Sequence, residues 1–216
     1  MIRFIDLPTE RTTAATDLIL AIQTGLMTAF LAGSAALHTF RGWLWIGVFG
    51  GMSLTALLGT IAHGFMMTKK TNAVLWQFLT LCFSVCYVLI IGSLAFDLFG
   101  PAAGRVAVLV CTGLGLALVL ACLRWPAIVP KIIYIGVALG GLMLAAGLWL
   151  ALVRQQAGAW WLLGGMVLAL VATAVEARQK FRLKLIWEFD HHSAYHFYQF
   201  LSNFCLFLAT AAYFGL

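Results

Sequence analysis

Long apolar runs separated by short polar breaks are the dominant pattern of this 216-residue chain. A helix needs about 20 apolar residues to cross a bilayer, and helices are favoured there because lipid offers no partner for an unpaired backbone amide. Seven such runs lie at about residues 15–37, 43–66, 73–96, 102–123, 132–152, 160–175 and 192–214. The pattern predicts an all-α membrane protein, a bundle of seven transmembrane helices.

The composition supports a membrane protein and excludes two other classes. Hydrophobic residues make up 63% of the chain and charged residues 9%, and the mean hydropathy is +1.02. A soluble domain carries about 25% charged residues, and the 13 Lys and Arg residues are too scattered for a nucleic-acid surface. We expect residues 1–216 to form one membrane domain, with a short segment, 1–14, before the first span.

Basic residues are distributed unequally between the two sides of the predicted bundle. Three of the 13 lie on the side opposite the N-terminus: Arg41, Arg105 and Arg154. The other ten lie on the side of the N-terminus, and they are Arg3, Arg11, Lys69, Lys70, Arg124, Lys131, Arg178, Lys180, Arg182 and Lys184. Because basic loops stay in the cytoplasm, the N-terminus is expected to be cytoplasmic and the C-terminus to lie on the opposite side.

Three histidines are expected at the same depth in the bilayer, near its cytoplasmic surface. Polar residues inside a membrane usually mark function. His63 ends the second span, and His192 and His196 open the seventh. The i,i+4 spacing puts the last two on one helix face, as in helices that bind a metal through two histidines. Three protein ligands with one open position are typical of catalytic zinc. The pattern therefore predicts a zinc site formed by His63, His192 and His196.

His191 is harder to place from its spacing. It precedes His196 by five residues, which turns it about 140° away on an ideal helix. We therefore expect it beside the ligands or at the membrane interface. A small shift in the start of the helix would exchange His191 and His192 as ligands.

This arrangement resembles the seven-span membrane hydrolase superfamily that joins alkaline ceramidases with the progestin and adiponectin receptors. That superfamily has one zinc-binding histidine at the end of its second span and an HxxxH pair at the start of its seventh. These positions correspond to His63, His192 and His196 here. The resemblance implies zinc-dependent hydrolysis of an amide or ester bond in a membrane lipid. It also implies a divergent member located in a bacterial inner or plasma membrane.

The chain departs from the superfamily at two positions. The superfamily has a serine four residues before the first histidine, where this chain has Gly59, followed by Thr60. It also has an aspartate near the start of its third span, where this chain offers only Asn72 and Gln77. The metal ligands therefore match the pattern, whereas the groups that would transfer protons do not.

Other residues at the same depth are candidates for that proton transfer. Asp190 precedes the seventh span, and we expect it to act as the acid, with Thr60 and His191 as further catalytic candidates. Glu176 ends the sixth span and is most simply an interfacial charge. Asp17 is expected in the first turn of the first span, where a helix dipole favours an acid.

Two other functions remain open from the sequence. A haem-binding electron-transfer subunit could use His63 and His196 as axial ligands, because an i,i+4 pair cannot reach both faces of a haem. A non-catalytic receptor or scaffold with a structural metal would explain the missing serine and aspartate.

Two further expectations concern charged residues away from the histidines. The 178–189 connection alternates basic and apolar residues and is expected to lie at the membrane interface or to extend the sixth span. Asp97, at the end of the third span, is expected to face Arg105 across a short loop.

Overall fold

The computed structural model describes residues 3–124, 132–178, 182–184 and 187–216, with the backbone alone at 122–123 and 132–137. Within these residues every predicted span corresponds to a helix. The helices are α1 (Pro8–Gly33), α2 (Phe40–Gly64), α3 (Lys69–Phe99), α4 (Pro101–Arg124), α5 (Ile132–Leu152), α6 (Ala159–Arg178) and α7 (His191–Phe214). A short 3-10 helix, η1 (Ala35–Leu37), lies between α1 and α2.

Among the described residues, six helices are long and apolar enough to cross a membrane: α1, α2, α3, α4, α6 and α7. The part of α5 with described side chains, Ala138–Leu152, is apolar but shorter. Apolar side chains also face outward, as on α4, where Leu109, Leu114 and Leu120 are more than 60% exposed. Such a surface is stable in lipid and not in water. The protein is therefore a multi-pass membrane protein, and the count of seven spans stays a prediction.

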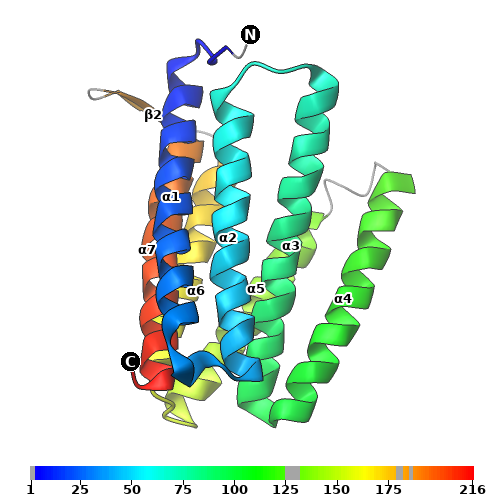
Figure 1. Ribbon diagram of the computed structural model, residues 1–216, viewed down its shortest axis with the longest axis vertical. Coiled ribbons are helices and arrows are strands. Elements are labelled where there is room, and N and C mark those ends of the chain that lie inside the picture. Colours follow the sequence, from blue (N-terminus) through cyan, green and yellow to red (C-terminus); the bar gives the residue numbers. More distant parts are fainter. Residues whose placement is uncertain (1–2, 125–131, 179–181, 185–186) are drawn as a thin grey trace.

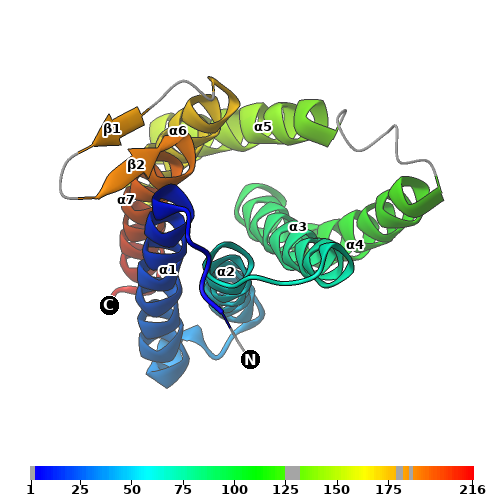
Figure 2. The same cartoon turned by 90° about the horizontal axis from the view of Figure 1, so that it is seen from above.

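The helices run along the long axis of the molecule and its termini lie at opposite ends (Figure 1). We call the end with the N-terminus and the α2–α3 connection the N-terminal end of the bundle, and the other the C-terminal end. Seen along the axis, α1 lies between α2 and α7, and α4 lies at the periphery beside α3 (Figure 2). The first and last helices of the chain are thus neighbours.

Local sequence signals account for most helix ends. Pro8 starts α1, because its missing N–H needs no partner at the first helical position. Thr39 and Thr68 cap α2 and α3, accepting hydrogen bonds from Gly42 N and Thr71 N (both 3.1 Å). The helix begins before the expected start of the first span near residue 15, because the polar turns from Pro8 onward are also helical. Residues 8–14 of the expected N-terminal segment are therefore part of α1.

The connection from α6 to α7 contains a small antiparallel hairpin rather than an extension of α6. Its strands are β1 (Arg182–Lys184) and β2 (Glu188–Asp190). Arg182 lies opposite Asp190 and Lys184 opposite Glu188, and the Lys184 ammonium lies 2.9 Å from the Glu188 carboxylate. Its basic side chains therefore face acidic partners across the hairpin.

The apolar core lies in the C-terminal half of the bundle. Trp45 and Phe49 of α2 are completely buried, as are Leu150 near the end of α5 and Leu162 near the start of α6. In α1 and α7 the N-terminal half instead buries polar side chains, namely Thr12, Thr13, Asp17, Ser193 and His196. Buried titratable groups of α1 and α7 are thus concentrated at the N-terminal end, and the largest buried apolar side chains at the other.

We predict that Gly158→Ala lowers stability by about 1–3 kcal/mol, because Gly158 starts the turn into α6 at a positive φ of 77° against α7. An added Cβ would lie 2.5 Å from the carbonyl oxygen of Ala209. Gly164→Ala on α6 is the matched control, since its Cβ would meet nothing within 4 Å. Thermal unfolding in detergent should show a lower melting temperature for Gly158→Ala alone, and equal values would contradict the packing described here.

Candidate functional site

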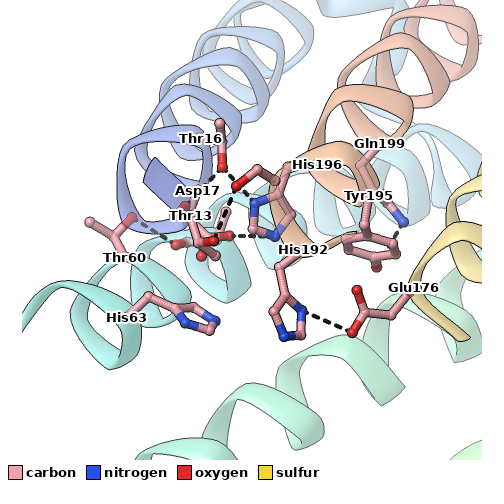
Figure 3. A network of polar contacts seen from close by, with 12 residues as sticks. Thr13, Thr16, Asp17, Thr60, His63, Glu176, His192, Tyr195, His196 and Gln199 are labelled. Carbon is pink, nitrogen blue, oxygen red and sulfur yellow. Dashed lines mark hydrogen bonds and ion pairs between the residues drawn. The ribbon is translucent and has the colours of Figure 1, made fainter. Parts of the chain in front are cut away.

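Titratable and hydroxyl side chains from four helices meet at the N-terminal end of the bundle (Figure 3). The close-up shows imidazole rings and carboxylates turned toward a common region between α1, α2, α6 and α7. We call this group the histidine cluster. Its members are Glu10, Thr13, Thr16, Asp17, His63, Glu176, His191, His192 and His196.

His63, in the last turn of α2, is oriented by a carboxylate from α1. Its Nδ1 lies 2.7 Å from Glu10 Oε2. The backbone next to it is also fixed, because Ile5 N donates to Gly64 O over 3.0 Å and so ties the N-terminal segment to the end of α2. The use of Nδ1 leaves Nε2 of His63 for a further partner.

His192, in the first turn of α7, pairs with α6. Its Nδ1 lies 2.9 Å from Glu176 Oε1. The His63 and His192 rings have their centroids 5.8 Å apart, so the predicted neighbours from α2 and α7 do lie side by side. The His191 ring is closer still to that of His192, at 4.1 Å.

His196, one turn further along α7, is buried between α7 and α1, with 8% of its surface exposed. The Thr16 hydroxyl lies 2.9 Å from Thr13 O and 2.8 Å from His196 Nδ1. It can donate its single proton to only one of them. Donation to Thr13 O places the His196 proton on Nδ1 and the lone pair on Nε2, whereas donation to Nδ1 places the proton on Nε2.

The Nε2 atom of His196 faces a carboxylate. His196 Nε2 lies 3.3 Å from Asp17 Oδ1, and the Asp17 side chain is 8% exposed. Two buried acceptors repel each other unless a proton or a cation lies between them. Two atoms bound to one tetrahedral zinc at about 2.0–2.1 Å are themselves about 3.3 Å apart. The contact thus fits either a shared proton or a shared metal ion.

Gly59 provides the space that Asp17 occupies. A Cβ on Gly59 would lie 2.6 Å from Asp17 Oδ2, so a serine here would collide with the carboxylate. The chain therefore combines a glycine on α2 with an acid on the facing turn of α1. The expectation that Asp17 is a first-turn acid was wrong, because α1 begins at Pro8 and places Asp17 in its third turn.

Two of the three expected catalytic residues have local structural roles. Asp190 caps α7, since its Oδ1 accepts from Ser193 N at 3.1 Å and from Ser193 Oγ at 3.2 Å. Thr60 donates its hydroxyl to Ala56 O one turn earlier, at 3.0 Å. His191 alone lies inside the cluster.

One trio in the described residues has ligand spacing for a metal: Glu176, His191 and His192, each with an atom within 4.8 Å of the others. Within the same residues, the predicted set of His63, His192 and His196 does not form so tight a group. His192 belongs to both sets. His192 could therefore bind a metal either with Glu176 and His191 or with His63 and His196. The predicted set of three histidines stays a prediction.

Both ring nitrogens of His196 already face a partner, which bears on the haem hypothesis. Thr16 occupies Nδ1 and Asp17 occupies Nε2. An axial bond from His196 to a haem would require one of these contacts to break. His38, at the C-terminal end of the bundle, contacts Ala32 O at 3.1 Å and is far from the cluster.

The pairing of these carboxylates with the histidines was not predicted from the sequence, although the sequence contains a signal for two of them. Glu10, Thr13 and Asp17 follow the i, i+3, i+7 spacing of one helix face. That stripe becomes visible only if the helix is started at Pro8 rather than near residue 15. Glu176 has no comparable signal, because no other member of the cluster lies on α6 to form a stripe with it.

Comparisons with known proteins identify the family of this chain and nothing closer. Neither curated proteins nor solved structures gave a match. Among family models, residues 12–213 match DUF6962, a family of unknown function. The matched range contains Asp17, Glu176 and all the histidines of the cluster, whereas Glu10 precedes it. Because the match covers nearly the whole length, the chain belongs to the family of unknown function DUF6962.

Proposed function

We propose that this protein is a zinc-dependent membrane hydrolase that cleaves an amide or ester bond of a lipid. The observation that carries the proposal is the buried contact of 3.3 Å between His196 Nε2 and Asp17 Oδ1. A His196 that carries its proton on Nδ1 presents the Nε2 lone pair to a divalent cation, with the Asp17 carboxylate beside it as a counter-charge. The resemblance to the ceramidase and adiponectin-receptor superfamily supports the choice of zinc.

The donor set of the cluster fits zinc, which prefers imidazole nitrogen and carboxylate oxygen. Histidines that bind a metal usually give their second nitrogen to a carboxylate, which fixes the ring and its tautomer. Glu10 does this for His63, and Glu176 for His192. We therefore assign zinc to His63, His192 and His196. When bound, zinc would polarise a carbonyl group and increase the acidity of water.

The protein's own groups would supply orientation and proton transfer. Asp17, held over Gly59, can receive a proton and return it beside His196. Tyr195 Oη accepts a hydrogen bond from Gln199 Nε2 at 2.9 Å, which leaves the phenol proton for an oxygen of the substrate. Figure 3 shows this phenol next to Glu176, at the edge of the cluster. Asp17 thus takes the role that the sequence suggested for Asp190.

A lipid is the substrate class that this architecture favours. The described chain is almost entirely helical, and its apolar side chains face outward along the helices. A substrate that diffuses within the bilayer can reach a site between helix ends without a soluble binding domain. The distribution of basic residues supports a cytoplasmic location for the cluster.

One observation favours a second function, a non-catalytic scaffold with a structural metal. Thr60 and Asp190, which the sequence offered for catalysis, are both engaged in local hydrogen bonds. Zinc content together with hydrolysis of a panel of lipid amides and esters separates the two functions. Bound zinc without any hydrolysis would favour the scaffold.

We predict about one zinc ion per chain in protein purified without chelator, measured by inductively coupled plasma mass spectrometry. His196→Ala and His63→Ala should lose it, because each removes a ligand. His38→Ala is the control, since this histidine lies at the other end of the bundle. Full zinc content in His196→Ala would contradict the assignment.

His191→Ala distinguishes the two possible ligand sets. It should retain zinc if His63, His192 and His196 are the ligands. Loss of zinc in His191→Ala with retention in His63→Ala would instead assign the metal to Glu176, His191 and His192.

We further predict that Gly59→Ala lowers zinc affinity by about tenfold to a hundredfold, as substitutions next to metal ligands commonly do. The added methyl group takes the space of the Asp17 carboxylate and turns it away from His196. Gly50→Ala on the same helix is the control, because its Cβ would make only an ordinary 3.6 Å contact with Thr28. The readout is the rise in melting temperature on adding zinc. An equal rise in both variants would show that Asp17 has no part in metal binding.

A further inference from the structure

A second polar cluster lies at the C-terminal end of the bundle, remote from the histidines. Arg41 in the first turn of α2 pairs with Asp97 in the last turns of α3, with Nε and Oδ1 2.7 Å apart. The expected contact between Asp97 and Arg105 was wrong, because the Arg105 guanidinium instead lies over the Phe40 ring, at 5.6 Å. The pair is buried, with 14% of the Arg41 side chain and 2% of the Asp97 side chain exposed.

Aromatic rings of α7 hold the arginine in place. The Arg41 guanidinium lies 4.3 Å from the centroid of the Tyr213 ring and 5.5 Å from that of Phe214. Contact with a ring face stabilises a cation and restricts its plane. The guanidinium is therefore fixed before any ligand arrives.

The pair leaves hydrogen-bonding capacity unused. In the described part of the chain, Arg41 Nη2, Asp97 Oδ2 and the Tyr213 hydroxyl are buried without a hydrogen-bond partner. Buried polar atoms without partners are costly. One buried ion pair thus contains both a donor and an acceptor without a hydrogen-bond partner.

A cavity of about 340 Å³, widely open to the outside, lies beside the pair. Its lining consists of Arg41, Phe96, Asp97, Arg154 and Gln156. The guanidinium groups of Arg41 and Arg154 and the single carboxylate of Asp97 give the lining a net positive charge. The volume lies in the lower range of small-ligand pockets.

The α5–α6 connection forms one side of this cavity in a defined conformation. Gln156 N donates to Leu150 O at 3.0 Å, and Arg154 Nη2 donates to Leu98 O at 3.4 Å. Gln155 adopts a left-handed conformation, with φ of 48°, and Gly158 packs against Ala209. The cavity is therefore built from ordered elements on both sides.

We propose that this cavity binds a phosphate group that carries a primary ammonium, as in a phosphoethanolamine headgroup. The phosphate pairs with Arg41 and Arg154, because guanidinium groups bind phosphate with parallel hydrogen bonds. The ammonium pairs with the Asp97 carboxylate, the acidic group of the lining. The lining residues lie at or next to the ends of α2, α3 and α5, where a spanning helix would approach the lipid headgroups. The proposal does not depend on the function of the histidine cluster.

The test measures lipid binding to the full-length protein by native mass spectrometry, with equimolar phosphatidylethanolamine and phosphatidylcholine. Phosphatidylethanolamine should bind more tightly, because the quaternary ammonium of choline has no N–H to donate. Arg154→Gln should weaken its binding about tenfold, the size expected for one charge-assisted hydrogen bond. Arg105→Gln is the matched control, since this arginine lies on the same side but does not line the cavity.

Asp97→Asn tests whether Asp97 recognises the ammonium group. The readout is the preference for phosphatidylethanolamine over phosphatidylcholine, which would not change if Asp97 had only a structural role. The substitution keeps the size of the side chain and removes its charge, so the preference for ethanolamine over choline should fall while phosphate binding remains. Free glycerophosphoethanolamine identifies the source of the ligand. Displacement of the lipid by an equal concentration assigns the site to a soluble headgroup, and no displacement assigns it to the lipid.

Three outcomes would overturn the proposal. The first is equal binding of phosphatidylethanolamine and phosphatidylcholine to the unmodified protein. The second is indistinguishable lipid binding by Arg154→Gln and Arg105→Gln. The third is an unchanged headgroup preference in Asp97→Asn.

Discussion

Contacts between a histidine and a carboxylate on another helix are the constraint on which the N-terminal half of this bundle depends. His63 joins α2 to α1, His196 joins α7 to α1, and His192 joins α7 to α6. A charged or polar side chain at this depth is costly unless it finds a partner. Each pair therefore fixes both a helix contact and the orientation of an imidazole, so the same interactions that hold the helices together also prepare the site.

The two ends of the bundle solve the same physical problem in different ways. At the N-terminal end, imidazoles and carboxylates of four helices share one cluster, in which His196 Nε2 lies 3.3 Å from Asp17 Oδ1. At the C-terminal end, Arg41 and Asp97 form one ion pair against the aromatic rings of α7, close to an apolar core that contains Trp45 and Phe49. Both arrangements leave hydrogen-bonding or metal-binding capacity unused, and in a chain with 9% charged residues such capacity is concentrated in few places.

Asp17 of α1 and Gly59 of α2 fit together across the helix interface. A Cβ on Gly59 would lie 2.6 Å from Asp17 Oδ2, so the carboxylate occupies space that a larger residue on α2 would take. The position of the acid therefore depends on the glycine, and the spacing of the histidines along the chain contains no sign of this contact.

The sequence by itself determined the helices and the end at which the histidines gather. Apolar runs must be long enough to cross a bilayer, which predicted the helices to within a few residues except at the start of α1. The spacing of His192 and His196 placed them on one face, and span order brought His63 to the same end. These results depend on distances along the chain, which a sequence contains directly.

Only the tertiary structure decided which acids face which histidines. Glu10 and Asp17 act across helix interfaces, and their partners are 53 and 179 residues away in the chain. The rotation of each helix about its axis and the closeness of α1 to α7 result from packing, as at Gly59 and Gly158. The pairing of Asp97 with Arg41 rather than Arg105 has the same origin. Local pattern contains no information on these rotations, because they depend on the shapes of two surfaces at once.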